Sequence, residues 1–210
     1  TASFLGWTLD AFDFFVVVFL YDTLAEQFHV SKAAIVATVA WTLLMRPIGA
    51  VIFGLMADRY GRRIPLMANV IFFSVVELLC GFAPNYTVFL ILRILYGIGM
   101  GGEWGVGASL AMESVSTRWR GILSGILQNG YAVGYLLAAL AYRFAFTSLG
   151  WQWMFWLGGI PALLALYIRS KVPESEAWRR PRAKSTAAVL REVRQERKLC
   201  LYLVLLITFM

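Results

Sequence analysis

Charged residues are scarce in this chain. Only 15% of its 210 residues are Asp, Glu, Lys or Arg, whereas 60% are hydrophobic, and the mean hydropathy is +0.70. A soluble domain carries about a quarter charged residues, so this sequence has too little polar surface to cover a soluble fold. The composition therefore predicts a protein embedded in a membrane.

Residue types that carry much enzyme chemistry are also rare. His29 is the single histidine and reads as a surface residue, and Cys80 and Cys200 both fall inside apolar runs. Such placement argues against a disulfide framework. The sequence shows no metal-ligand cluster, nucleophile–histidine pair or phosphate-binding loop. We therefore expect no cofactor, no metal and no enzymatic activity.

A net charge of +7 and a pI near 9.7 raise the question of nucleic acid binding. The basic residues lie in the links between apolar runs, and no basic face recurs at helical spacing as it does in DNA-binding proteins. The lipid bilayer, rather than a nucleic acid, is therefore the expected partner.

Apolar runs of membrane-spanning length occur repeatedly. A helix needs about 20 mostly apolar residues to cross a bilayer, and six runs meet this requirement: 4–21, 35–57, 64–83, 87–112, 120–143 and 151–169. A seventh run begins near Leu199. We expect a six-helix transmembrane domain over 1–169, a polar linker over 170–198, and the start of a seventh helix over 199–210.

The basic residues between these runs are distributed asymmetrically. Fifteen of the 19 lysines and arginines fall on one expected side of the membrane, only Lys32 and Arg143 fall on the other, and Arg46 and Arg93 lie within spans. Because cytoplasmic loops are enriched in Lys and Arg, this pattern places the N-terminus and the 170–198 linker in the cytoplasm. We expect a multi-pass protein of the cell membrane, which in a bacterium is the inner membrane.

The link between the second and third runs carries a specific pattern. It reads Gly-x3-Asp-Arg-x-Gly-Arg-Arg over residues 54–63. This pattern resembles the loop signature between helices 2 and 3 of the major facilitator superfamily of transporters. The resemblance implies an all-α membrane fold, here a six-helix N-terminal bundle built from two three-helix inverted repeats. It also implies a C-terminal six-helix half as partner.

Three further segments are similar to one branch of that superfamily. They are "LDAFDFF" at 9–15, "RPIGAVIFG" at 46–54, and the Gly-rich stretch that runs from Arg93 to Gly105 and ends in "GGEWG". They look like proton symporters of carboxylates and sialic acid. Arg-x3-Gly-x-Gly, which begins at Arg93, is similar to a helix-4 signature whose arginine is associated with proton transfer. For the glycines themselves we favour helix packing.

Charges inside membrane spans are costly and are functional candidates by default. The six here are Asp10, Asp13, Arg46, Glu77, Arg93 and Glu103. Helical rise places Asp13 and Arg46 near mid-membrane, where we expect them to meet, and the family signature favours Arg93 as the partner of the first-helix aspartate. Glu77 has no obvious partner. Asp13, Asp10, Arg93 and Glu103 are the proton-coupling candidates; the alternative is a static ion pair that locks two helices.

Polar and aromatic residues in the fifth run are candidates for binding the substrate. The expected substrate-binding set consists of Arg46 and Arg93 together with four residues of this run, namely Gln128, Asn129, Tyr131 and Tyr135. An amide such as Gln128 could hydrogen-bond a hydroxyl or a carboxylate. Hydrogen bonding between helices explains the same residue equally well.

The cytoplasmic charges have a mechanical interpretation as a gate. Arg59, Arg62 and Arg63 could pair with Glu113, and Arg120 with Glu174, while Asp58 at a helix end is attracted to the positive N-terminus of another helix. The gating set also contains Gly54 and Gly61, which belong to the loop signature. For Arg63, a role in topology alone is an equal alternative.

The favoured function is proton-coupled symport of a small organic anion, a monocarboxylate such as lactate or sialic acid, by alternating access. Protonation of Asp13 would release an arginine to bind the substrate carboxylate. One alternative is a facilitator or proton symporter of neutral sugars, in which the buried charges are structural. A membrane receptor or enzyme is a further alternative.

Overall fold

The structure, a computed structural model, describes residues 2–113 and 115–159. The expected linker 170–198, the segment 199–210 and the end of the sixth apolar run lie outside the described residues. The described part is helical, with no strand in it. Its helices are α1 (Ala2–Phe19), α2 (Tyr21–Gln27), α3 (Lys32–Tyr60), α4 (Arg63–Cys80), α5 (Tyr86–Glu113), η1 (Thr117–Trp119), α6 (Arg120–Ala141), η2 (Tyr142–Phe146), α7 (Thr147–Leu149) and α8 (Trp151–Leu157).

The helices follow the apolar runs, but two of the runs contain an irregularity. Four helical segments are long and apolar enough to cross a membrane, namely Lys32–Tyr60, Arg63–Cys80, Tyr86–Met112 and Thr117–Phe144. The first apolar run is broken instead: Ser3–Phe19 and Tyr21–Gln27 meet at an angle of 61° and together make a fifth candidate span. The fifth run ends in a turn of π-helix over Tyr142–Phe146.

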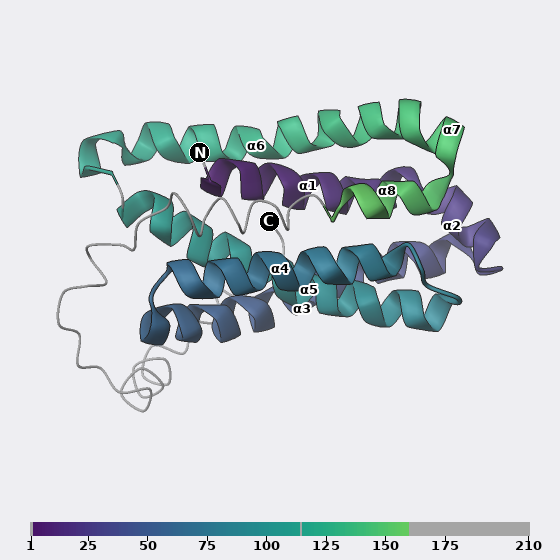
Figure 1. Cartoon of the computed structure of the whole chain (residues 1–210), viewed down its shortest axis with the longest axis horizontal. Helices are drawn as coiled ribbons and strands as arrows, with labels where there is room; N and C mark the ends of the chain where they lie inside the picture. Colours follow the sequence, from purple (N-terminus) through teal and green to yellow (C-terminus); the bar gives the residue numbers. More distant parts are fainter. Residues whose placement is uncertain (1, 114, 160–210) are drawn as a thin grey trace.

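The long helices lie side by side in two groups. Figure 1 shows α3, α4 and α5 packed together below, with α1, α6 and α8 above them. The closest pairings are α3 with α5 and α1 with α6. Functional side chains that point inward from α1, α3, α4 and α5 therefore converge between the two groups.

Glycines set the close contact between α3 and α5. A side-chain carbon at Gly97 would overlap the carbonyl oxygen of Thr42, and one at Gly101 would overlap that of Arg46. The Thr42 hydroxyl donates a hydrogen bond to the Arg93 carbonyl across the same contact, at 3.1 Å. Small residues allow backbones to approach in this way inside a membrane, so the packing role expected for these glycines is present in the structure.

The contact between α1 and α6 follows the same rule. A side-chain carbon at Gly134 would overlap the backbone of Thr8, and Gly130 faces the Thr8 hydroxyl. These two glycines are four residues apart, so they lie on one face of α6. Their contact fixes the rotation of α1 and turns Asp10 and Asp13 into the interior, where both are fully buried.

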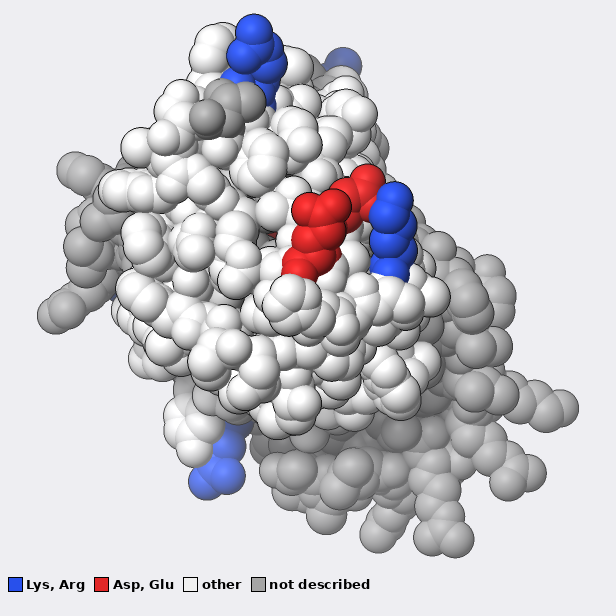
Figure 2. Space-filling view, turned by 90° about the vertical axis from the view of Figure 1, so that its right-hand side faces the viewer, with Lys and Arg blue, Asp and Glu red and all other residues white. Residues whose placement is uncertain are grey.

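The two ends of the bundle differ in charge. The turn between α3 and α4 and the turn between α5 and α6 lie at the same end (Figure 1); they carry Arg59, Arg62, Arg63, Arg118 and Arg120. Figure 2 views the opposite end, which is largely uncharged apart from small groups of acidic and basic side chains. There Lys32 forms an ion pair with Asp22.

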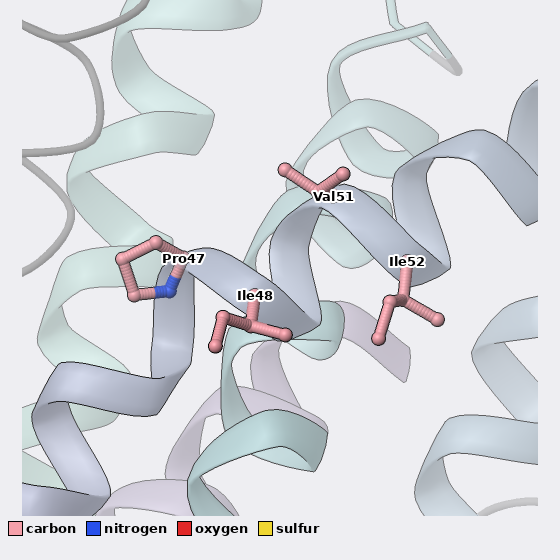
Figure 3. A pocket seen from close by; sticks show the side chains of 4 residues that line it. All are labelled: Pro47, Ile48, Val51 and Ile52. Atoms are coloured by element: carbon pink, nitrogen blue, oxygen red, sulfur yellow. The ribbon is translucent and has the colours of Figure 1, made fainter.

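Two hydrophobic clusters occupy the two halves of the bundle. One joins the later part of α3 to α4 and to the middle and later parts of α5, and the other joins the later part of α1 to α2, α8 and the turn between α4 and α5. An apolar hollow on the outside of α3 is lined by Pro47, Ile48, Val51 and Ile52 (Figure 3). That hollow lies away from the buried face of α3, which carries Arg46, so it is separate from the charged site.

Candidate substrate and proton site

The interior contains all six of the charged residues predicted within spans. Each is at most 4% exposed. They come from four helices: Asp10 and Asp13 from α1, Arg46 from α3, Glu77 from α4, and Arg93 and Glu103 from α5. Sequence position alone therefore identified the members of the buried charged group, whereas their pairing differs from the expectation.

Arg93 pairs with Glu77. Arg93 Nη2 and Glu77 Oε2 form a hydrogen-bonded ion pair, and both side chains are buried. The expected pairing of Arg93 with a first-helix aspartate is wrong in this structure, as is the expectation that Glu77 lacks a partner. The turn between α4 and α5 is short, so residues near the end of α4 and the start of α5 lie at similar depth; the rotation of the helices then makes them face each other.

Tyr96 connects this ion pair to Asp10. The Arg93 guanidinium carbon lies 4.3 Å from the centroid of the Tyr96 ring, a cation–π contact. The Tyr96 hydroxyl lies 3.2 Å from the Asp10 carbonyl oxygen and 3.3 Å from Asp10 Oδ1, to which it can donate. Tyr96 itself is fully buried, so it is a fixed link between α5 and α1.

The two aspartates of α1 have different surroundings. Asp10 Oδ2 accepts a hydrogen bond from Trp104 Nε1 at 2.7 Å. Neither carboxylate oxygen of Asp13 has a hydrogen-bond partner among the described residues. Gly158 packs directly against Asp13 and Glu77, leaving no space for a side chain. The expected meeting of Asp13 with Arg46 is therefore not seen; Asp10 is the aspartate that is held by donors.

Arg46 is a buried cation that contacts no carboxylate among the described residues. Its Nε and Nη2 atoms point to the Met100 sulfur at 3.1 and 2.8 Å, and a thioether is a weak acceptor. The guanidinium also lies 5.0 Å from the Trp104 ring centroid and 5.8 Å from that of Phe14. This arrangement holds the guanidinium in place and leaves its capacity for strong, charge-assisted hydrogen bonds unused.

Glu103 is the fourth buried acid. It is 4% exposed, and its Oε2 atom has no hydrogen-bond partner among the described residues. No Lys or Arg side chain among the described residues forms an ion pair with Glu103.

The balance of buried charge follows from these contacts. Within residues 2–113 and 115–159, four buried carboxyl groups face two buried guanidinium groups. An ionised carboxylate without a partner in a low-dielectric interior costs many kcal/mol, and such a group neutralises instead. Protonation of two of the four acids would make the group neutral, and Asp13 and Glu103 are the two acids for which the described residues provide no partner.

The predicted binding residues of α6 divide into two pairs. Tyr131 and Tyr135 contact α1 through the Phe15 ring, at 5.1 and 4.9 Å between centroids. Tyr131 also lies 6.5 Å from Trp104, so it borders the Arg46 site. Gln128 and Asn129 are exposed and are not brought to the buried charges. The Asn129 amide donates to the Gly125 carbonyl of its own helix at 2.9 Å.

The predicted gating residues are partly described. Arg62 Nη1 lies 2.8 Å from Asp58 Oδ1 in an ion pair one helical turn apart, and Arg59 lies over the Tyr60 ring. Gly61 has φ of 96° and ends α3, a conformation that favours glycine. Arg120 is exposed and Gly54 has open space beside it. The Glu113 side chain and Glu174 lie outside the described residues, so their pairing stays a prediction.

Sequence reasoning missed three residues that shape the site. Tyr96, Met100 and Trp104 all lie on α5 and all point at a buried charge. Their spacing of four residues places them on one face of the helix with Arg93 at its start. This spacing is the sequence signal that could have identified the three residues. The described residues also contain no group of three or more His, Cys, Asp or Glu side chains arranged to hold a metal ion.

Comparison with known proteins decides the family. The model of the sugar (and other) transporter family matches residues 2–200. This chain belongs to that family. The assignment confirms the resemblance to the major facilitator superfamily, and with it the all-α fold of a multi-pass membrane transporter.

Relatives within the family are transporters of small organic molecules. A probable 4-methylmuconolactone transporter of Cupriavidus pinatubonensis is 37% identical over 185 residues, which cover 86% of this chain and 43% of that protein. The sialic acid transporter NanX of Escherichia coli is 31% identical over 210 residues, covering 99% of this chain and 51% of NanX. The chain thus spans about half the length of these relatives.

A solved structure supports the fold. The proton:xylose symporter XylE of Escherichia coli, bound to 6-bromo-6-deoxy-D-glucose, superposes with a TM-score of 0.76 at 25% identity. The match covers 99% of this chain and 51% of XylE. XylE, like the two curated relatives, is a transporter and not an enzyme.

Proposed function

We propose that this chain forms the N-terminal half of a proton-coupled symporter that carries a small organic anion, a monocarboxylate such as lactate, or sialic acid. Transport requires the C-terminal six-helix half, and alternating access moves the site between the two sides of the cell membrane. The N-terminus and the 170–198 linker face the cytoplasm. The substrates after which two relatives are named, 4-methylmuconolactone and sialic acid, support a small organic acid.

The observation on which this proposal rests is the environment of the buried Arg46 guanidinium. A guanidinium is a bidentate partner for a carboxylate, and Arg46 makes no contact with a carboxylate of the described residues. Burial next to Trp104 and Phe14 shields it from water, which strengthens any ion pair formed there. Arg93 is already paired with Glu77, so Arg46 is the better candidate for binding the anion.

Proton coupling is supported by the excess of buried acids over buried arginines. Asp10, Asp13 and Glu103 are the candidates to carry a proton, since Glu77 is held by Arg93. A carboxylate that is shielded from water can exchange its proton when an access path opens on one side. Alternation between ionised and neutral forms would then link the proton gradient to the movement of substrate.

Transport of neutral sugars is the second candidate. The structural similarity to a proton:xylose symporter favours it. In that case Arg46 would be a structural cation, and hydroxyl and amide groups would recognise the substrate. Uptake assays separate the two functions, because a sugar porter should be indifferent to replacing a carboxylate with its neutral amide.

The test uses purified full-length transporter in proteoliposomes. We expect labelled lactate or N-acetylneuraminate to accumulate when the outside is acidic, and to equilibrate without accumulation when the pH gradient is collapsed with an ionophore. Lactamide and xylose serve as neutral controls. Accumulation of xylose, but of neither acid, would establish the sugar alternative and contradict this proposal.

A further inference from the structure

We propose that the site takes an aromatic monocarboxylate, whose carboxylate binds Arg46 and whose ring packs against the side chains of Phe14 and Trp104. This inference rests on the proposed function of organic anion symport and narrows it to one class of substrate, a single carboxylate attached to a flat aromatic ring. Lactate has no ring, and sialic acid carries several hydroxyl groups, so both should bind less tightly than an aromatic acid.

Four aromatic side chains form a closed series of contacts that begins and ends at Arg46. The guanidinium carbon lies 5.0 Å from the Trp104 ring centroid and 5.8 Å from that of Phe14. From Trp104 the series continues to Tyr131, at 6.5 Å between centroids. Phe15 closes it, at 5.1 Å from Tyr131 and 5.4 Å from Phe14. These four rings, here termed the aromatic collar, come from α1, α5 and α6.

The collar differs from the aromatic residues of the hydrophobic core. Core rings such as Phe73, Phe89 and Tyr96 are fully buried, whereas all four rings of the collar keep part of their surface exposed. Arg46 is only 2% exposed. The cation therefore lies deeper than the rings that contact it, and a ligand that reaches it must place the rest of its structure among those rings.

Contacts within the bundle fix the orientation of the collar. Trp104 Nε1 donates a hydrogen bond to Asp10 Oδ2 at 2.7 Å, and the Trp7 ring lies 4.8 Å from the Trp104 ring. The rings of Phe14 and Phe15 meet edge to face, at an interplanar angle of 81°. A rigid set of rings suits a rigid ligand, because little conformational entropy is lost on either side.

The direct link between carboxylate and ring matches the two parts of this site. A carboxylate that binds the Arg46 guanidinium replaces the weak contacts with the Met100 sulfur by charge-assisted hydrogen bonds. In benzoate the ring is joined to the carboxylate by one bond, so it lies next to the rings that contact the same guanidinium. Aromatic pairs in edge-to-face or offset geometry attract each other beyond the effect of buried area.

The collar is poorly suited to a substrate with many hydroxyl groups. Its side chains contain two hydrogen-bonding atoms, the Tyr131 hydroxyl and Trp104 Nε1, and the second of these is already engaged. The amides of Gln128 and Asn129 are exposed, and Asn129 donates to its own helix. Since a buried polar group without a partner is costly, these surroundings favour a ligand that is apolar apart from its carboxylate.

The first experiment compares matched ligands on the purified full-length transporter. Benzoate, cyclohexanecarboxylate and benzamide are titrated calorimetrically at neutral pH. Benzoate should bind about threefold to tenfold more tightly than cyclohexanecarboxylate, which has the same charge and a saturated ring, because only benzoate forms aromatic pairs. Benzamide should bind much more weakly than either acid, since it lacks the charge that Arg46 binds. Lactate and N-acetylneuraminate should also bind more weakly than benzoate.

The second experiment removes one ring. Phe14→Leu keeps an apolar side chain, so it should lower the affinity for benzoate by the same factor while the affinity for cyclohexanecarboxylate changes little. Phe82→Leu is the matched control, because Phe82 is 67% exposed in the turn between α4 and α5, and it should alter neither affinity. The ratio of the two affinities is measured on one protein sample, so a partial loss of folded protein does not affect it.

Exchange of labelled benzoate in proteoliposomes, measured against protein-free liposomes, completes the test, and the outcomes separate the two proposals. If wild type binds and transports neither benzoate, lactate nor N-acetylneuraminate, the proposed function fails. If it transports lactate or N-acetylneuraminate but binds benzoate no better than cyclohexanecarboxylate, the aromatic substrate class is overturned and organic anion transport stands. A preference for benzoate that Phe14→Leu leaves unchanged would overturn the assignment to the collar.

Discussion

At the scale of single residues, two arginines with the same chemistry have different environments. Arg93 is held by Glu77 and by the Tyr96 ring, so its charge is neutralised within the bundle. Arg46 is held by a thioether and two aromatic rings. Removing Arg93 should therefore affect folding, whereas removing Arg46 should affect substrate recognition.

Arg46→Ala should weaken binding of lactate or N-acetylneuraminate by about tenfold to a hundredfold, because one charge-assisted hydrogen bond contributes roughly 1.5–3 kcal/mol. Binding of the neutral amide analogue should change little. Calorimetric or thermal-shift titration of the full-length protein with both ligands measures the difference. Equal losses for acid and amide would argue against direct recognition by Arg46.

Glu77→Gln should lower thermal stability strongly, since breaking a buried pair by removing one partner costs about 3–5 kcal/mol. The double variant Glu77→Gln with Arg93→Gln should recover part of this loss, because no unpaired charge remains. A double-mutant cycle from thermal unfolding of all four proteins gives the coupling. Strictly additive losses would show that the two side chains do not depend on each other.

At the scale of helices, the contact between α3 and α5 positions Arg46. Gly97 and Gly101 let α5 approach the backbone of Thr42 and Arg46. The same helix carries Met100 and Trp104, which hold the guanidinium. Any change in the separation of these helices should therefore reach the substrate site.

Gly101→Ala should destabilise the protein by about 1–3 kcal/mol, as overpacking of a close contact does. It should also weaken anion binding, because Arg46 must move with its own backbone. Gly105→Ala is the matched control on α5, since open space surrounds that position. Thermal unfolding and anion titration of both variants test this; similar behaviour of the two would mean that α3 and α5 can separate without cost.

At the scale of the whole molecule, the basic turns lie at one end of the bundle, and the buried charged residues lie in the interior of the bundle. Arg62 pairs with Asp58 in the turn between α3 and α4. This turn lies at the end that we propose to be cytoplasmic. If its charges hold the cytoplasmic side closed, they would control access to a site that they do not touch.

Asp58→Asn and Glu113→Gln in the full-length transporter should each shift the population toward the inward-open state. The free-energy shift should equal that of the lost interaction, about 1–3 kcal/mol per partly buried pair. Cysteines placed at cytoplasmic helix ends should react faster with a bulky thiol reagent, and those at outer ends more slowly. Transport should fall while binding is retained. Unchanged labelling on both faces with normal transport would leave these charges a role in topology alone.

Composition and spacing alone predicted most of the framework. Run lengths marked the four candidate spans from Lys32 to Phe144, and the loop pattern at 54–63 indicated the family that the comparison confirmed. Hydrophobicity and length act locally along the chain, so they can be read without knowing the neighbours of a helix. The bend after Phe19 and the π-helical turn at Tyr142–Phe146 carry no comparable signal in their apolar sequence.

The tertiary structure alone decided how the buried charges are paired. The sequence placed Asp10, Asp13, Arg46, Glu77 and Arg93 inside the membrane, yet it could not distinguish Asp13 from Glu77 as the partner of Arg93. Pairing depends on how the helices are rotated and how they cross. Close contacts between helices, such as that of Gly134 with Thr8, set this rotation and crossing. A rotation of 100° per residue separates neighbouring positions on a helix, so depth along the chain gives the height of a charge but not the direction in which it points.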